Sequence, residues 1–455
     1  MLKVQLAKHY AFIIANLFAL LVLLISQAAS VAAQARNRSV DVLHYDVALE
    51  PDIRAKTIKG IVKIRFTTTT ALNKLSLNSG DLIIDGVRSK GRALQNSVAD
   101  HRLEITLPAT LKPRAISEVE VAYHGSPRYG IRFFPEKNQV YTIFSTSQWM
   151  ICEDSPDDRA TLRIVLTSTP GLTHLSNGKE TNHQALADGR IQTTWSQNSP
   201  VPTYTFGFVI GPFRTLSERR GAVELRYLAT SFSDDQVLRI FRDTKDMLTF
   251  FEDRAGVKYQ DHAYSQVLAV GDAEQEMSSF TALNEDYGSR VLADEKDIWL
   301  GAHEFAHQWW GNMVTCEDWN HFWLNEGIAT FMAAAYLEHR FGHESYLKEI
   351  EQYRSSYEKI KSAGKDKSLV FPNWLHPTRE DRTLVYDKGA FVMHLLREEM
   401  GEEAFWKGLR SYTRANFGRS VVTRDFEKAM EVSAGKSLTT FFSKWIYLND
   451  ATRND

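Results

Sequence analysis

Hydrophobic and polar residues alternate along much of the first half of the chain. From Val40 to about Thr215, apolar side chains recur at every second position in short runs, which Gly, Asn, Asp and Pro residues separate. One such run extends from Val62 to Phe66, with the sequence VKIRF. Alternation of this kind between turn residues is typical of half-buried strands. We therefore expect an antiparallel β-sandwich, since no fixed-period repeat indicates a solenoid or a propeller.

The spacing of apolar residues becomes helical in the second half. Beyond Ser217 they recur every three or four positions from Ser233 to Arg254 and in several later segments, which places them on one face of a helix. We expect one domain over residues 34–216 and a second, mainly helical domain over 217–455, which makes a multidomain α+β protein. The later helices are predicted over residues 297–310, 325–340, 345–362, 386–400 and 424–432.

The amino-terminal segment differs from the rest of the chain. Two lysines precede an uncharged stretch from Tyr10 to Ala35, which has an apolar core and ends in small residues. This pattern predicts a signal peptide over residues 1–33. The alternative is an uncleaved membrane anchor, since a tilted span tolerates the single interruption at Asn16. In both cases we expect an exported protein that is periplasmic, extracellular or anchored to the membrane and facing outward.

Composition and charge narrow the classes of function. The hydrophobic share of 43% and the charged share of 24% are those of a folded globular protein. Lys and Arg number 54 against 56 Asp and Glu, so no positive excess favours binding to nucleic acid. Cys152 and Cys316 are too few for a disulfide framework or a multi-cysteine zinc site. We expect two free, buried thiols, and a single bridge between them is the alternative.

The segment GAHEFAHQWWGN carries the candidate chemistry. His303 and His307 are four residues apart on a predicted helix, so both imidazoles project from the same face. A catalytic zinc ion uses three protein ligands of this kind and keeps a fourth position open for water. Glu304 lies between the histidines and is assigned no metal bond. It is therefore predicted to be the general base that takes a proton from water and returns it to the leaving amine.

A third ligand must come from elsewhere in the chain. The metzincin pattern would require Gly and His at later positions where Trp310 and Met313 stand, so that class is excluded. Glu326 follows nineteen residues after His307 in the segment FWLNEGIATFM, where Asn325 is predicted to cap a new helix. Two neighbouring helices would then hold one Zn2+ per chain. The predicted zinc ligands are His303, His307 and Glu326.

These segments resemble the gluzincin aminopeptidases of the aminopeptidase N type. The similarity extends over most of the chain, and it implies a thermolysin-like catalytic domain behind the amino-terminal β-sandwich and removal of amino-terminal residues from peptides. It also implies that Tyr386 donates a hydrogen bond to the oxyanion that develops on the scissile carbonyl. The matching segments are HEFAHQWWGN, WLNEGIAT, YDKGAFVMHLL, CEDSPDDRATLRIVLTSTP, THLSNG and TYTFGFVIGPF.

The sequence departs from the family at the segment that binds the substrate amine. The family's Gly-Ala-Met-Glu-Asn pentad aligns with Ala-Glu-Gln-Glu-Met at residues 273–277, so only the glutamate is kept. The resemblance implies that Glu276 binds the free α-amino group, with Glu274 as the alternative, and that the first specificity pocket is changed. Gln148 is a weak candidate for the residue of the amino-terminal domain that helps to hold this amine.

The leading prediction is a zinc aminopeptidase that acts on peptides with a free amino terminus. One alternative is a gluzincin endopeptidase, which would not need Glu276. Another is a non-catalytic peptide-binding homologue, which is disfavoured because both histidines, Glu304, Glu326 and Tyr386 are all present. Relatives often continue into further domains where this chain stops at Asp455. We therefore expect an open active site, or one that a second subunit of a homo-oligomer covers.

Overall fold

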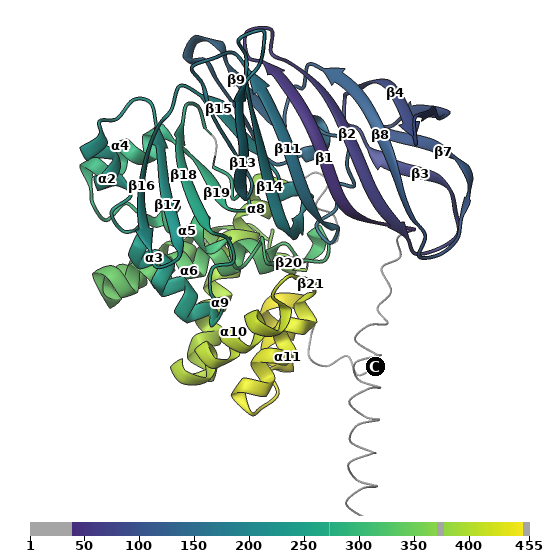
Figure 1. The fold of residues 1–455 in the computed structure, drawn as a ribbon. Helices are drawn as coiled ribbons and strands as arrows, with labels where there is room; N and C mark the ends of the chain where they lie inside the picture. Colours follow the sequence, from purple (N-terminus) through teal and green to yellow (C-terminus); the bar gives the residue numbers. More distant parts are fainter. Residues whose placement is uncertain (1–38, 273, 371–376, 449–455) are drawn as a thin grey trace, which may run out of the picture.

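The first half of the chain folds into β-sheets (Figure 1). The computed structural model describes residues 39–272, 274–370 and 377–448, so the predicted signal peptide lies outside the described residues. An eight-stranded sheet has the order β13-β14-β11-β1-β2-β8-β4-β5. Its strands are β1 (Val40–Asp52), β2 (Thr57–Thr68), β4 (Ile83–Ser89), β5 (Arg92–Ala93), β8 (Ile116–Gly125), β11 (Arg159–Ser168), β13 (Lys179–Ala185) and β14 (Ile191–Pro202).

The alternating run predicted from Val62 to Phe66 behaves as expected. In β2 every second side chain is buried, including Val62, Ile64 and Phe66. These side chains share one core with Leu75 and Leu77 of a second, three-stranded sheet, of order β3-β7-β6. The β-rich amino-terminal domain is thus confirmed. The strands of the second sheet are β3 (Leu72–Asn78), β6 (Asn96–Ala99) and β7 (Arg102–Leu111).

The large sheet is not wholly antiparallel, which corrects the prediction. Strand β1 runs parallel to β11, with His44 opposite Thr161 and Leu49 opposite Leu166. A parallel pair cannot be joined by a hairpin and needs a long connection. Here the chain passes through the strands from β2 to β10 before β11 returns to the free edge of β1.

A four-stranded sheet connects the amino-terminal domain to the helical part. Its order is β12-β15-β10-β9, and its residues Val140, Leu175 and Val209 lie in the same core as the sandwich. Residues of β9 and of the loop after β10 line a cleft that also includes Tyr386. Its strands are β9 (Ile131–Phe134), β10 (Gln139–Thr142), β12 (Thr173–Ser176) and β15 (Phe208–Gly211).

The second half is helical but includes a mixed sheet of order β16-β17-β18-β19. The boundary predicted between residues 216 and 217 falls inside β16, which pairs with β17. The strands are β16 (Arg214–Arg220), β17 (Val223–Ala229), β18 (Ala263–Ala269) and β19 (Phe280–Asn284), with a short pair, β20 (Val314–Cys316) and β21 (Arg419–Val421). The helices are α2 (Asp234–Ile240), α3 (Thr244–Ala255), α4 (Glu285–Ala293), α5 (Trp299–Ala306), α6 (Trp323–Phe341), α7 (His343–Ser362), α8 (Arg379–Thr383), α9 (Gly389–Met400), α10 (Glu402–Asn416), α11 (Thr423–Ala434) and α12 (Thr439–Phe442).

The helix predicted from Ser233 to Arg254 is two helices, α2 and α3. Ser233 caps α2 by accepting a hydrogen bond from the backbone N–H of Gln236, as sequence rules for helix starts lead one to expect. Asp243 lies at the junction, where Arg340 of α6 donates a 2.8 Å hydrogen bond to its carboxylate. The apolar periodicity continues across this break, so the periodicity alone did not reveal it.

Both halves of the molecule are joined by buried polar contacts. Arg159 of β11 donates hydrogen bonds to Thr315 Oγ1 at 2.8 Å and to the carbonyl of Asn312 at 2.9 Å. Both acceptors lie just past the predicted zinc helix.

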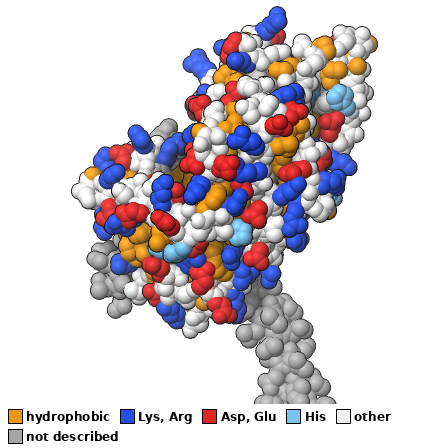
Figure 2. Space-filling view, turned by 90° about the vertical axis from the view of Figure 1, so that its left-hand side faces the viewer, with side chains coloured by type: hydrophobic (Ala, Val, Ile, Leu, Met, Phe, Trp, Pro, Cys, Tyr) orange, Lys and Arg blue, Asp and Glu red, His pale blue; other side chains and the backbone are white. Residues whose placement is uncertain are grey.

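Cys152 and Cys316 are both buried and free. Within the described ranges, no helix has the length and apolarity needed to cross a membrane. On the face in Figure 2, charged side chains of both signs are interspersed.

Candidate metal centre and active site

Helix α5 presents both predicted histidine ligands to one point. The helix ends at Ala306, and His307 continues the helical backbone, with its N–H bonded to the carbonyl of His303. The two Nε2 atoms lie 3.1 Å apart. Both side chains are buried, with exposed fractions of 3% for His303 and 1% for His307.

Glu326 in the first turn of α6 completes the cluster. Its Oε2 atom lies 3.4 Å from His303 Nε2 and 3.3 Å from His307 Nε2. Asn325 does not cap this helix, which corrects the prediction, because α6 already begins at Trp323. The Asn325 side chain instead accepts a hydrogen bond from the backbone of Cys316 and donates one to the hydroxyl of Tyr204.

This cluster fits a zinc ion. Ligand atoms about 2.0–2.2 Å from a tetrahedral zinc ion lie roughly 3.3 Å from one another, and the three separations here are 3.1, 3.3 and 3.4 Å. Glu326 Oε2 is buried and accepts no hydrogen bond from the described residues. Burial would raise the pKa of Glu326, but His307 and His303 outweigh it and hold the pKa below its usual range. The carboxylate therefore stays ionised at neutral pH, as a metal ligand must.

Neighbouring groups orient the two imidazoles. The carbonyl of Trp310 lies 3.0 Å from His307 Nδ1, and Thr330 Oγ1 lies 3.4 Å from His303 Nδ1. Such contacts to the second ring nitrogen leave Nε2 free for a metal. Thr330 was not identified from the sequence, although its position four residues after Glu326 on the same helix face is a signal that could have found it.

Glu304 lies beside the ligands but has a different environment. Its side chain is buried, and Glu304 Oε2 has no hydrogen-bond partner among the described residues. Burial, reinforced by the nearby charge of Glu276, raises the pKa of Glu304 well above its usual range. A carboxylate with raised proton affinity next to an open metal position is suited to accept a proton from water.

Tyr386 reaches the cluster from a π-helical turn, Leu384–Lys388. Its ring lies 5.9 Å from the His303 ring, and burial, together with the charge of Glu326, raises the pKa of Tyr386 well above its usual range. The hydroxyl therefore keeps its proton and can donate it in a hydrogen bond. Lys388 anchors this turn through a buried 2.7 Å ion pair with Asp366. π-Helical turns are frequent at functional sites.

Two glycines allow helix α6, which carries Glu326, to approach helix α9, which directly follows the turn with Tyr386. Gly327 follows Glu326, and Gly389 begins α9 directly after the π-helical turn. A Cβ atom on Gly327 would lie only 2.9 Å from the Cα atom of Gly389. Any larger residue at either position would therefore push α6 and α9 apart.

Glu276 lies in the same buried cluster. Its exposed fraction is 3%, and burial raises the pKa of Glu276 to about 7. Gln275 donates a 2.7 Å hydrogen bond to Glu276 Oε2, and Asn312 donates one to its backbone carbonyl. Glu276 Oε1 has no partner among the described residues. One carboxylate oxygen is thus positioned and the other is available to a ligand.

Gln275 connects this glutamate to the amino-terminal domain. Its Oε1 atom accepts a 2.9 Å hydrogen bond from the backbone N–H of Phe144, in the loop after β10. Phe144 has a φ of 41° and the next residue, Ser145, has a φ of 32°, values that are uncommon for residues other than glycine. Gln275 stands where the family pentad has methionine, and the sequence alone did not reveal its part in holding Glu276.

The two weaker candidates, Glu274 and Gln148, differ in their surroundings. Glu274 is exposed and accepts a 2.6 Å hydrogen bond from Asn284, whereas Glu276 is the buried one. Gln148 is buried against Gly80 and Gly130. Ala273, the first residue of the aligned pentad, lies outside the described residues.

The tryptophans near the zinc helices pack them against other helices. Trp310 donates a 2.9 Å hydrogen bond to Thr413 of α10, and Trp323 donates one of 2.9 Å to Thr423 of α11. These hydrogen bonds tie Trp310, which follows α5, and Trp323, which begins α6, to the carboxy-terminal helices.

Comparison with known proteins gives two family matches, in chain order. Residues 42–205 match the peptidase M1 N-terminal domain, and residues 241–445 match the peptidase family M1 domain. These two family matches, together with the HExxH histidines and the later glutamate that two helices bring to one point, define a zinc metallopeptidase of the gluzincin type. The chain belongs to peptidase family M1, and His303, His307 and Glu326 form its zinc site.

Curated relatives are longer than this chain. Aminopeptidase N of Lactococcus lactis subsp. lactis is 27% identical over 450 residues, which cover 89% of this chain and 50% of that protein. Aminopeptidase 2, mitochondrial, of Saccharomyces cerevisiae is 23% identical over 442 residues, which cover 89% and 46%. The chain thus spans about half the length of the curated relatives it matches.

Solved structures share the fold over nearly their whole length. An M1 zinc metallopeptidase from Deinococcus radiodurans, bound to the substrate Tyr-Ser-Ala, superimposes with a TM-score of 0.77 at 23% identity, over 91% of this chain and 96% of that one. A two-domain M1 zinc metallopeptidase bound to L-arginine gives 0.78 at 22% identity, over 92% and 96%. This likeness shows that the two-part architecture of the chain occurs in solved proteins.

Proposed function

We propose that the protein is a zinc aminopeptidase that removes the first residue of peptides with a free amino terminus. The observation that carries this proposal is Glu276, a buried carboxylate in the zinc cluster with one oxygen held by Gln275 and the other free. An ammonium group is the natural partner for such an oxygen, because a charge-assisted hydrogen bond offsets the cost of burying both charges. The family membership and the aminopeptidase names of the relatives support the same activity.

Binding of the amine would fix the position of the first peptide bond. With the ammonium group at Glu276, the carbonyl of the first residue lies a few bonds away and is directed towards His303, His307 and Glu326. A zinc ion at these ligands supplies a Lewis acid and a water of lowered pKa. Because Glu276 can accept only one cationic end, the site would cut one residue from the terminus rather than within a chain.

Two residues of the chain would handle the proton and the developing charge. Glu304 accepts a proton from the attacking water at its carboxylate and later delivers it to the leaving amine. Tyr386 Oη donates a hydrogen bond to the carbonyl oxygen as that oxygen becomes negative. Its anchored turn, held by Lys388 and Asp366, keeps this donor in place before the substrate arrives.

Hydrolysis of a panel of aminoacyl anilides tests this function. We expect the purified chain from residue 34 onward to cleave anilides with a free amine and not their N-acetylated counterparts, and to lose activity with a zinc chelator. Cleavage of blocked peptides would instead support an endopeptidase. A protein that binds zinc and peptide but cleaves neither would be a non-catalytic homologue.

We further propose export, on the basis of the uncharged segment from Tyr10 to Ala35. Amino-terminal sequencing of protein recovered from cell fractions tests this proposal. A mature start near Gln34 in an exported fraction would support a cleaved signal peptide. An intact amino terminus in the membrane fraction would indicate the anchor, and an intact one in the cytoplasm would contradict export.

A further inference from the structure

Tyr386, whose ring lies 5.9 Å from that of His303, also lines a cleft. It has a volume of about 440 Å³, which is in the range of ligand-binding pockets. Part of its lining comes from the peptidase domain and includes Trp319 and Tyr386, with Tyr204 of the amino-terminal domain beside Trp319. Another part comes from β9 and from the loop after β10, which includes Phe144. A substrate with its carbonyl at Tyr386 would therefore place its neighbouring groups in this cleft.

Two arginines line this aromatic cleft without a counter-ion. Arg132 of β9 is half-buried, and its Nε atom is buried with no hydrogen-bond acceptor. Arg382 of α8 lies on the same lining. Among the described residues, neither arginine has a hydrogen bond or an ion pair with a carboxylate. Arg382 is exposed, whereas the buried Nε atom of Arg132 lacks an acceptor, which costs free energy that an anionic ligand would recover.

Asp154 is the single acidic residue among the described residues of the cleft lining, and it forms no ion pair with either arginine. Asp154 lines the same cleft, but its carboxylate accepts a 3.2 Å hydrogen bond from the backbone of Ser147. Burial raises the pKa of Asp154, and two arginines face this single carboxyl group on the lining. The cleft therefore carries net positive charge close to the reacting carbonyl.

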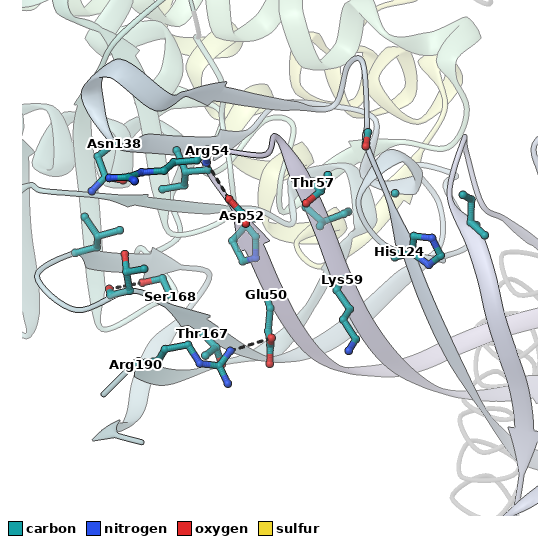
Figure 3. Close-up of a pocket in the computed structure, with 18 of the residues that line it drawn as sticks. Glu50, Asp52, Arg54, Thr57, Lys59, His124, Asn138, Thr167, Ser168 and Arg190 are labelled. Atoms are coloured by element: carbon teal, nitrogen blue, oxygen red, sulfur yellow. Dashed lines mark hydrogen bonds and ion pairs between the residues drawn. The ribbon is translucent and has the colours of Figure 1, made fainter. Parts of the chain in front are cut away.

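A second cavity is lined by three arginines, Arg54, Arg128 and Arg190, of which Arg190 forms ion pairs. This cavity, of about 1330 Å³, lies on the amino-terminal domain away from the zinc cluster (Figure 3). Its Arg190 is already paired, with Glu50 at 3.0 Å and with Asp188 at 2.8 Å.

We propose that Arg132 and Arg382 bind a carboxylate group of the peptide substrate in this cleft, so that the enzyme prefers peptides that carry a carboxylate near the scissile bond. The inference rests on the proposed aminopeptidase function and names its substrate class. Two sources supply this chemistry: an acidic side chain on the peptide, or the terminal carboxylate of a peptide only a few residues long. Arginine suits both, because its paired N–H groups match the two carboxylate oxygens.

Kinetics on paired substrates test the proposal and separate its two sources. One pair compares Ala-Ala-Ala with its carboxy-terminal amide, and the other compares amidated peptides that begin with Glu or with Gln. We expect kcat/KM of the zinc enzyme to favour the carboxylate by about 10-fold or more in at least one pair, the size of a charge-assisted hydrogen bond. A preference in the first pair identifies the terminal carboxylate, and one in the second pair identifies the side chain.

Substitution of each arginine assigns the preference to the cleft. Arg132→Gln and Arg382→Gln should each bring the ratio within a pair close to one. The ratio cancels the fraction of folded enzyme, so a partly unfolded variant does not imitate this result. Arg128→Gln is the matched control for Arg132→Gln, and Arg379→Gln is the matched control for Arg382→Gln. Both control arginines are exposed, lie close in the sequence to the residue they match, and do not line the cleft. Both controls should keep the wild-type ratio.

Equal kcat/KM values in both pairs for the wild type would overturn the proposal, as would arginine variants that keep the wild-type preference. Calorimetry with the zinc-loaded Glu304→Gln variant tests binding without turnover. We expect it to bind the favoured carboxylate peptide about 10-fold more tightly than its neutral partner. If this binding difference is present but no free-amine anilide is cleaved, the proposed function fails and the carboxylate site stands. If anilides are cleaved but the binding difference is absent, only the carboxylate site fails.

Discussion

The zinc cluster and the substrate cleft beside it are built in opposite ways. The three ligands come from two helices within 24 residues of sequence, from His303 to Glu326, and all are buried. The cleft draws on β9, the loop after β10, the turn at Tyr204 and helix α8, which are far apart in the chain. The cluster is therefore a local property of one motif, whereas the cleft exists only because two domains pack together.

This difference implies that the cluster sets the rate of the reaction, whereas the cleft sets the preference between substrates. Changes at the zinc ligands, Glu304 or Tyr386 should lower turnover of every substrate by the same factor. Changes in the cleft wall should alter the ratio between substrates and leave the chemistry intact. The predictions below test this separation at single residues.

The largest effect is expected at Glu304. Glu304→Gln removes the proton acceptor but no metal ligand, so kcat should fall by about 10³–10⁴ for every peptide. Zinc content by elemental analysis should stay at one ion per chain. A variant that keeps most of its activity would show that another group is the general base.

A smaller loss of turnover is expected for Tyr386→Phe. Loss of one hydrogen-bond donor to an oxyanion costs about 10²–10³ in kcat, while KM should change little because the ground-state carbonyl needs the bond less. The steady-state constants for one anilide measure this split. Tyr447→Phe is the control, since its hydroxyl contacts Glu427 outside the cluster. A rise in KM with unchanged kcat would place Tyr386 in binding rather than in catalysis.

The sheet behind the cleft should lose stability in acid. His174 of β12 is buried between Ser168 and Thr193, and burial lowers the pKa of His174 from 6.5 to about 4. As the pH falls, His174 is protonated at a higher pH in the unfolded chain than in the folded one. This residue therefore stabilises the fold above pH 6.5, and its contribution is lost as the pH falls towards 4. It amounts to at most about 3 kcal/mol.

Denaturant unfolding at several pH values checks this expectation. The free energy of unfolding of His174→Gln should fall less between pH 6.5 and 4 than that of the wild type. His262→Gln, which changes an exposed histidine, should follow the wild type. Parallel pH curves for the wild type and His174→Gln would show that this histidine does not couple the sheet to acid.

The smallest effect is expected at Gln275, which links Phe144 of the cleft lining to Glu276. Gln275→Met restores the family residue and removes the hydrogen bond to Glu276 Oε2 and the acceptor for Phe144. We expect kcat/KM for free-amine substrates to fall by about 10-fold, with no gain for acetylated ones. Gln184→Met on exposed β13 serves as the control. An unchanged kcat/KM for Gln275→Met would mean that Glu276 needs no positioning.

The sequence predicted the cluster well and the cleft poorly, for a physical reason. Helical periodicity places His303 and His307 on one face, and the position of Glu326 on a second helix follows from the motif. The break between α2 and α3, the parallel pairing of β1 with β11 and the link from Gln275 to Phe144 all depend on distant partners. Local spacing contains no information on such partners, so they required the structure.

The central claim is that Glu276 makes this zinc centre an aminopeptidase. The most direct test is the ratio of kcat/KM between a free-amine peptide and its N-acetylated form, for the wild type and for Glu276→Ala, both loaded with zinc. We predict a large ratio for the wild type and a ratio near one for the variant, because the carboxylate that recognises the amine is gone. An equally large ratio in Glu276→Ala would contradict the account and place amine recognition elsewhere.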